Sequence, residues 1–256
     1  YSGSSEHFCI SSTISCLLTI IYIHMRKIVI IPSKTPSISK TLVSYFDEAG
    51  WETYVMDGCS SIFEAYEKGI VESKVKPSDY VIMCHDDINI LTNSIDFNSI
   101  IEGFLQKKKI GFLGVAGTKV LKESCVWWEG LKLHGSVYQS DHLAGIVYHG
   151  TSVMDMTSTY YGPTGKVVAM DGVFLACLGS TLLGMRLGKP KEFEGNWDFY
   201  DLYYTLQAHF KGLENYVTPI SILHKSVGNI RGKDSWHKNR EALSKKLGDK
   251  LPAHVK

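Results

Sequence analysis

An alternation of short apolar runs and amphipathic stretches between residues 27 and 115 constrains the fold more than any other feature of the sequence. Continuous runs of aliphatic and β-branched residues are typical of buried parallel strands, and they lie at 27–31, 51–56, 80–84 and 109–115. Helices are predicted between the first three strands, one stopping at Gly50 and one capped by Ser60 or Ser61. Since this β-α-β-α-β order requires crossover connections, we expect a parallel sheet with helices on its faces.

The second half of the chain carries weaker signals. Residues 116–165 are rich in Gly, Ser, Thr, Tyr and His, so we expect loops and short antiparallel strands there, such as 145–148. Two further strands are expected at 166–170 and 216–223, and Pro219 marks the second as an edge strand or a bulge. Helical spacing predicts helices at 197–210 and 235–247.

The first 24 residues contain an apolar run at 14–23, which is half of the about 20 residues that span a bilayer. Met25 and the first strand follow at once. We therefore interpret 1–24 as an extension outside the fold and 25–256 as a single domain, with a short membrane anchor as the alternative for the extension. We expect no stable membrane span, and peripheral membrane contact stays open.

Composition and charge exclude two classes of protein. Hydrophobic residues make up 44% and charged residues 21%, which excludes global disorder. The net charge of +1 argues against a protein that coats nucleic acid, so we expect no nucleic-acid partner. The six cysteines form no CxxC pair and the chain has no N-x-Ser/Thr site, which favours a reducing compartment, the cytoplasm. Cys84 and Cys177 are expected to be buried thiols.

Polar residues follow several of the expected strands, where open α/β sheets bind ligands. They are Pro32 and Ser33, Asp57, the run His85-Asp86-Asp87, and Asp171. Crowded carboxylates at a strand end are costly unless a cation neutralises them, so Mg²⁺ or Mn²⁺ is one interpretation of the run at 85–87. A helix-capping Asp pair is the other, and the residues alone favour neither.

Three more side chains are candidates. His224 ends an apolar strand; an ordinary core or surface histidine is the simpler interpretation, and a third metal ligand beside Asp87 is the functional one. Asp198 is expected to cap the helix at 197–210. Asp201 is expected to lie too far along that helix to cap it, so partial burial beside Tyr200 and Tyr203 would suit a general base.

In their order and spacing these motifs resemble the GT-A-fold, family-2-like glycosyltransferases, most closely the StrF-type domain of streptomycin biosynthesis. The resemblance covers about residues 25–230. The matching segments are Ile30-Ile31-Pro32-Ser33, the helix at 60–69, the apolar run and His-x-Asp at 80–87, the Asp-Gly segment at 170–176, the helix at 199–212 and His224-x-Ser226-x-Gly228.

This resemblance implies an α/β, Rossmann-like GT-A fold. Its central sheet would be mixed, mostly parallel and flanked by helices, with a smaller antiparallel region on the acceptor side. The domain would divide into a nucleotide-binding half (25–115), an acceptor-binding half (116–230) and a basic C-terminal loop and helix (231–256). The implied activity is metal-dependent transfer of a sugar from a nucleotide-diphosphate sugar, a UDP-sugar first, to a glycan or other hydroxyl acceptor with inversion.

The resemblance also implies residue roles. Mn²⁺ or Mg²⁺ would be held by Asp87, His224 and His85. Asp201 would deprotonate the acceptor hydroxyl, and Asp171 would contact the transferred sugar or the acceptor. The donor nucleotide and its diphosphate would be held by Pro32, Ser33, Asp57, Asp86, Arg231, Lys233 and His237, although a solvated basic helix is the simpler interpretation of the C-terminal charges.

Aromatic and histidine side chains in 116–165 are candidates for the acceptor side, because aromatic faces suit sugar rings. They are Trp127, Trp128, His134, Tyr138, His142, Tyr148, Tyr160 and Tyr161. A mixed core under loops is the alternative. For the whole chain, two other functions stay open: a catalytically silent nucleotide- or sugar-binding module, and a sugar nucleotidyltransferase, although the latter usually has a Gly-rich loop and residues 31–35 contain no Gly.

Overall fold

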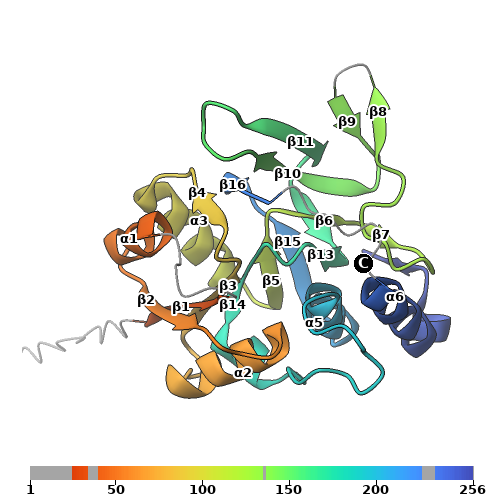
Figure 1. Ribbon diagram of the computed structural model, residues 1–256, viewed down its shortest axis with the longest axis horizontal. Coiled ribbons are helices and arrows are strands. Elements are labelled where there is room, and N and C mark those ends of the chain that lie inside the picture. The colour runs from red at the N-terminus through yellow and green to blue at the C-terminus, as the bar shows by residue number, and fades with distance from the viewer. Residues whose placement is uncertain (1–24, 34–39, 135–136, 227–233, 256) are drawn as a thin grey trace, which may run out of the picture.

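A computed structural model describes residues 25–33, 40–134, 137–226 and 234–255. Its central sheet has seven strands. In spatial order they are β12 (Gly165–Val167), β15 (Glu214–Val217), β5 (Ile110–Gly114), β14 (Phe174–Leu178), β3 (Tyr80–Cys84), β1 (Lys27–Pro32) and β2 (Glu52–Met56). Of these, β1, β2, β3, β5, β14 and β15 are labelled in Figure 1. The four strands expected in the first half of the chain are therefore all present.

The central sheet is mixed. The pairs β1–β2, β1–β3 and β5–β15 are parallel, whereas β14 is antiparallel to both β3 and β5, and β12 is antiparallel to β15. The strand at 174–178 has no clear signal in the sequence. This run, Phe-Leu-Ala-Cys-Leu, is apolar on both faces, so its periodicity does not separate a strand from a buried helix.

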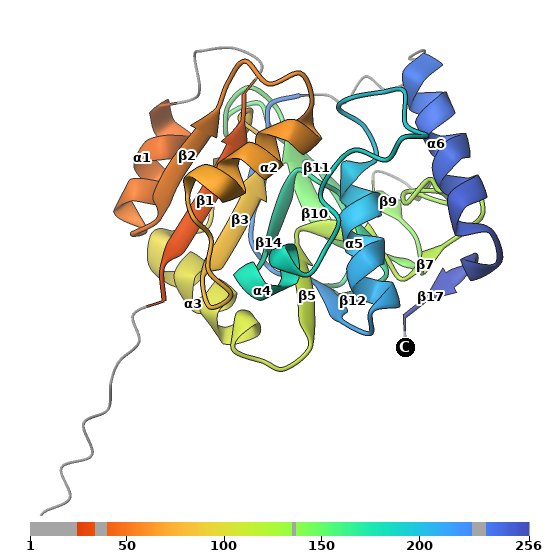
Figure 2. The same cartoon turned by 90° about the horizontal axis from the view of Figure 1, so that it is seen from below.

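Helices cover both faces of this sheet (Figures 1 and 2). One face carries α1 (Lys40–Glu48) and α3 (Ser94–Leu105), and the other carries α2 (Ile62–Glu72) and α5 (Tyr200–Phe210). Phe97 of α3 packs edge-on against Phe46 and Phe174 in the core. Ser61 caps α2, as predicted, because its hydroxyl oxygen accepts the Glu64 N–H at 3.0 Å. The helix α3 was not among the elements predicted from the sequence.

A second sheet begins where β3 and β5 end. Its strands are β13 (Ala169–Met170), β6 (Ala116–Thr118), β10 (Leu143–His149), β16 (Ile222–His224) and β4 (Ile88–Ile90), with β11 (Thr157–Gly162) paired to β10. The pairs β6–β10 and β10–β11 are antiparallel, which confirms the expected short antiparallel strands in 116–165.

Two expected strands are wrong as continuous elements, because each is divided between the two sheets. The segment 166–170 splits at Val168 into β12 and β13. The segment 216–223 splits into β15 and β16, with Pro219 between them. Proline has no N–H for a sheet ladder, so the chain leaves one sheet before it and joins the other after it.

The helix α6 and several short elements complete the described part of the chain. They are α4 (Gly179–Leu183), α6 (Asp234–Leu247), the 3-10 turn η1 (Gly248–Lys250), and the strands β7 (Val120–Leu121), β8 (Lys132–His134), β9 (Val137–Gln139) and β17 (Ala253–His254). Cys84 and Cys177 are buried and free, as expected. Among the described residues, no helix has the length and apolar character needed to cross a membrane. The prediction for 1–24 lies outside the described residues.

Candidate functional site

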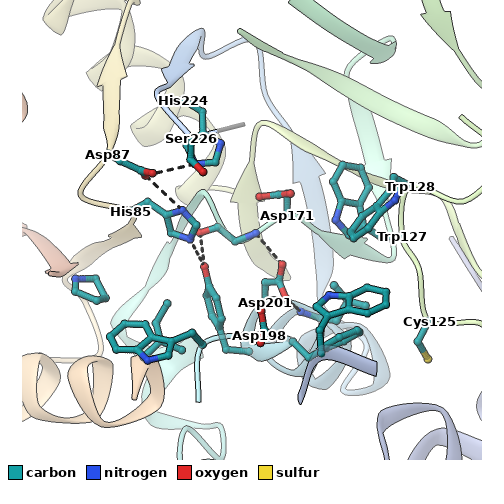
Figure 3. A pocket seen from close by; sticks show the side chains of 18 of the residues that line it. His85, Asp87, Cys125, Trp127, Trp128, Asp171, Asp198, Asp201, His224 and Ser226 are labelled. Carbon is teal, nitrogen blue, oxygen red and sulfur yellow. Dashed lines mark hydrogen bonds and ion pairs between the residues drawn. The ribbon is translucent and has the colours of Figure 1, made fainter. Parts of the chain in front are cut away.

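A cavity of about 610 Å³ lies at the carboxyl ends of β1 and β3, where the two sheets meet (Figure 3). Several of the sequence candidates line it: Pro32, His85, Asp86, Asp87, Asp171, Asp201 and His224. The fold thus brings together residues that are far apart in the sequence, although Asp57, which follows β2, is not among them. His224 reaches the site because β16 pairs with β4, in register His224 to Ile88, directly after the run at 85–87.

His85, Asp87 and His224 form one compact group, with one ligand atom of each lying within 4.8 Å of the others. His224 Nε2 is 3.3 Å and His85 Nδ1 is 3.7 Å from Asp87 Oδ1. The 3.3 Å separation is an ion-pair distance, yet both His224 Nε2 and Asp87 Oδ1 are buried without a well-formed hydrogen bond. Burial lowers the pKa of His224, but the contact with Asp87 and its charge raise it more, so the two groups share a proton here. A divalent cation bound by both groups would take the place of that proton.

Tyr200 fixes the proton on the His85 ring. The Tyr200 hydroxyl donates to the Gly172 carbonyl at 2.8 Å, and His85 Nε2 lies 2.8 Å from the same hydroxyl oxygen. The hydroxyl has one proton, so His85 Nε2 carries the N–H and Nδ1 presents its lone pair to Asp87. Burial and then the charge of His224 lower the pKa of His85, which keeps the ring neutral.

These donors fit a divalent cation. One carboxylate oxygen and two imidazole nitrogens lie within 4.8 Å of one another, and Asp87 Oδ1 and His224 Nε2 form no hydrogen bond of standard geometry. An outer partner that orients a ligating histidine, as Tyr200 orients His85, is usual at metal sites. His149 lies beside this group, with its ring centroid 5.8 Å from that of His224 and its Nδ1 also buried without a partner.

Asp201 and Asp171 stand side by side on the cavity wall. Asp201 Oδ2 accepts the Gly172 N–H at 3.0 Å and Oδ1 accepts the Leu202 N–H at 2.8 Å. Burial, and then the charge of Asp171, raise the pKa of Asp201 to about 7. Asp171 Oδ1 accepts the Val173 N–H at 2.9 Å. A carboxyl group with a pKa near neutrality can take up a proton at physiological pH.

The predicted start of this helix is wrong. Phe199 is the N-cap, at φ 64° and without a side-chain cap, so Asp198 does not cap α5 and instead lines the cavity. Asp201 therefore lies in the first turn of α5, closer to the start of the helix than predicted. The helix thus begins with Tyr200, whose hydroxyl lies 2.8 Å from His85 Nε2, and no sequence signal indicated this contact.

Only some of the predicted donor-binding residues lie at the cavity. Ser33 is 1% exposed and its hydroxyl donates to Asp86 Oδ2 at 2.8 Å, which joins the ends of β1 and β3. Asp57 is exposed after β2 and is not among the described residues that line the cavity. His237 is exposed on α6 and also lies off the lining, whereas its neighbour Trp236 belongs to it. Arg231 and Lys233 lie outside the described residues.

The aromatic candidates are divided as well. Trp127, Trp128 and Tyr161 line the cavity, but Tyr160 is 37% exposed. His142 contacts the Glu129 carbonyl at 2.7 Å and so holds a loop. The side chains of His134 and Tyr138 lie outside the described residues, and Tyr148 is not among the described lining residues. The lining residues His149 and Phe199 were not among the candidates predicted from the sequence.

Comparison with known proteins gives one family. A model described as "Glycosyltransferase like family" matches residues 42–245. The chain belongs to this glycosyltransferase-like family. Membership confirms the coarser part of the resemblance drawn from the motifs, and the mixed α/β fold is consistent with it. No curated protein matches the chain. Among solved structures it is similar to "Crystal Structure of A197 from STIV", with a TM-score of 0.44 and 14% identity over 76% of this chain and 82% of that chain.

Proposed function

We propose that this glycosyltransferase-like protein is a metal-dependent enzyme that transfers a sugar from a nucleotide-diphosphate sugar to a hydroxyl acceptor with inversion. One observation carries the proposal: a His-Asp-His group whose ligand atoms lie within 4.8 Å of one another and a carboxyl group with a pKa of about 7 line the same cavity. The first group suits a cation beside a diphosphate, and the second suits a base beside an acceptor.

The donor side of the proposal rests on the strand ends. His85, Asp87 and His224 would hold Mn²⁺ or Mg²⁺, which supplies neutralising charge for a departing nucleotide diphosphate. Pro32 and the bonded pair Ser33–Asp86 lie beside this group and are proposed to hold the ribose and base. Basic side chains of Arg231, Lys233 and His237 are proposed contacts for the diphosphate, and Asp57 is proposed as a more distant donor contact.

Asp201 is proposed as the base that removes the acceptor proton. Its two backbone hydrogen bonds fix the carboxylate, and each oxygen keeps a lone pair for an acceptor hydroxyl. A single base acting in line with the leaving group gives inversion at the anomeric carbon. Asp171, beside it, is proposed to contact the transferred sugar or the acceptor. The His-x-Asp pattern at 85–87 and the terminal His224 also lead us to propose membership of the StrF-type branch.

A nucleotide-sugar screen with and without Mn²⁺ tests this function. We expect one UDP-, GDP- or dTDP-sugar to raise the melting temperature only with metal, and the same donor to be consumed with an acceptor. Asp201→Asn should lose turnover by roughly 100-fold or more while keeping the donor-induced shift. Asp47→Asn, an exposed change on α1, is the matched control.

Three results would each contradict a part of this proposal. Donor-induced stabilisation without turnover indicates a binding module, and release of pyrophosphate from a nucleotide triphosphate and a sugar phosphate indicates a nucleotidyltransferase. A product with the donor's anomeric configuration retained contradicts the single-base mechanism.

A further inference from the structure

The cavity has a second side, opposite the His-Asp-His group, that is built from aromatic rings. We name Trp127, Trp128, Tyr161, Phe199 and Trp236 the aromatic wall. Figure 3 places Trp127 and Trp128 across the cavity from His85, Asp87 and His224, with Asp171 and Asp201 between them. Since metal and diphosphate would occupy the first side, the aromatic wall faces whatever lies beyond the transferred sugar.

The wall is a continuous series of ring contacts between distant segments. The ring centroids of Tyr161 and Trp127 are 5.1 Å apart, and those of Trp127 and Trp128 are 5.5 Å apart. Trp128 meets Trp236 of α6 at 6.1 Å, and Trp236 meets Phe199 at 5.2 Å. Trp127 and Phe199 are buried, whereas Trp128, Tyr161 and Trp236 are partly exposed. The buried rings thus support rings that offer free surface to the cavity.

The C-terminal helix belongs to this wall and is held firmly in place. Asn239 of α6 is fully buried, its Oδ1 accepting the Gly195 N–H at 2.9 Å and its Nδ2 donating to the Gly195 carbonyl at 3.1 Å. This amide pair fixes the first turns of α6, and with them Trp236, against the segment before α5. The wall is therefore preformed and needs little ordering on binding.

Carboxylates border the wall. Asp171, Asp198 and Asp201 all line the cavity next to the aromatic rings. The pKa of Tyr161 is raised, first by burial and then by the charge of Asp171, so this charge acts on the wall. An anionic group placed against the wall would meet these like charges in a partly dry cavity, which is unfavourable. A neutral hydroxyl or an ammonium group would instead find hydrogen-bond acceptors.

From these observations we infer that the aromatic wall is the acceptor subsite, and that it takes an uncharged or amino-bearing saccharide and excludes acidic ones. The apolar face of a sugar ring stacks on Trp128 and Trp236, while its hydroxyl or amino groups donate to the bordering carboxylates. This inference rests on the proposed function, because the wall is an acceptor site only if the nucleotide-sugar donor binds on the opposite side of the cavity.

Three tetrasaccharides of one length test the inference: chitotetraose, its de-N-acetylated form and tetragalacturonic acid. Calorimetric titration of the full chain, with UDP and Mn²⁺ and without them, should detect the first two and not the third. Trp128→Ala and Trp236→Ala should each weaken binding roughly 2- to 12-fold. Phe210→Ala removes a 37% exposed ring of α5 that is not among the described lining residues, and it should leave binding unchanged.

Asp198→Asn tests the charge separately from the rings. It should narrow the difference in affinity between the acidic and the neutral tetrasaccharide, because the amide oxygen still accepts from a sugar hydroxyl while the negative charge is gone. The inference is overturned if tetragalacturonic acid binds as well as chitotetraose, if neither tryptophan variant changes affinity, or if no tetrasaccharide binds. Glycan binding without any donor turnover would instead overturn the proposed function and leave the wall as a saccharide site.

Discussion

Asp201 combines a fixed geometry with a raised pKa of about 7, caused by burial and then by Asp171. A base works only when it is deprotonated, so its activity is present above that pKa and is lost below it. We expect kcat/KM to rise about tenfold per pH unit below pH 7 and to level off above it. Initial rates between pH 5 and 9, at saturating metal, measure this profile.

A neighbouring substitution checks the assignment of that pKa. Asp171→Asn removes a negative charge that raises the pKa of Asp201, so the acidic limb of the profile should move to lower pH. The overall rate is expected to fall as well, but the position of the limb is the decisive readout. A limb that stays in place would mean that another group titrates.

Tyr200 orients His85, and its hydroxyl is the group to remove. In Tyr200→Phe, the His85 Nε2–H and the Gly172 carbonyl both lose a partner, so the ring no longer has a fixed proton or orientation. We expect Mn²⁺ affinity to fall by about 10- to 100-fold. Calorimetric titration of Mn²⁺ without nucleotide measures it. Tyr203→Phe, on the same helix, is the control, and equal losses in both variants would contradict the role of Tyr200.

At the scale of elements, Gly172 sets how closely the start of α5 approaches the segment after β13. A methyl group at this position would overlap the Tyr200 hydroxyl and lie 2.8 Å from Asp201 Cβ. Both side chains would have to move, so Gly172→Ala is expected to weaken Mn²⁺ binding and turnover together and to lower the melting temperature.

Gly103 is the matched control for that change. It lies inside α3 with nothing within 4 Å of an added methyl group. Alanine favours the helix by about 0.5–1 kcal/mol over glycine, so Gly103→Ala should raise the melting temperature and leave metal binding alone. Equal behaviour of the two variants would show that space around Gly172 does not matter.

Local signals predicted much of the fold, and long-range pairing set the rest. The strands at β1, β2, β3 and β5 and the Ser61 cap follow from residues close in sequence. The insertion of β14 between β3 and β5, and the switch of sheets at Val168 and Pro219, depend on partners far along the chain. No periodicity within a segment reports which sheet it will join.

The same distinction applies to the site. His85, Asp87, Asp171 and His224 could be predicted as site residues because they follow or end predicted strands. Open α/β sheets bind their ligands at the carboxyl ends of the strands. The positions of Tyr200 and Trp236 in the cavity could not be predicted from the sequence. Tyr200 depends on the left-handed Phe199 that starts α5, and Trp236 depends on the Asn239–Gly195 contact that places α6.

For the whole molecule, the net charge of +1 conceals a strongly uneven distribution. The described lining of the cavity contains Asp86, Asp87, Asp171, Asp198 and Asp201. Gathering carboxylates opposes folding through mutual repulsion, and a bound cation relieves it. The stability of the whole chain should therefore respond to metal, even though the group that binds it is small.

Metal removal gives the broadest prediction. After chelation and dialysis, Mn²⁺ alone should raise the melting temperature, and at 100 times its Kd it should add about 2.7 kcal/mol to the free energy of unfolding. Two imidazoles and one carboxylate suit Mn²⁺ better than Mg²⁺, so Mg²⁺ should need higher concentrations for the same shift. Thermal unfolding across a titration of each ion measures both effects.

Two variants test where the cation binds. Asp87→Ala should abolish the shift in melting temperature, because Asp87 lies between the two imidazoles. His254→Ala, a change at an exposed residue of β17, should keep the shift. A shift that survives Asp87→Ala, or one that Mg²⁺ produces as readily as Mn²⁺, would place the cation elsewhere or require other ligands.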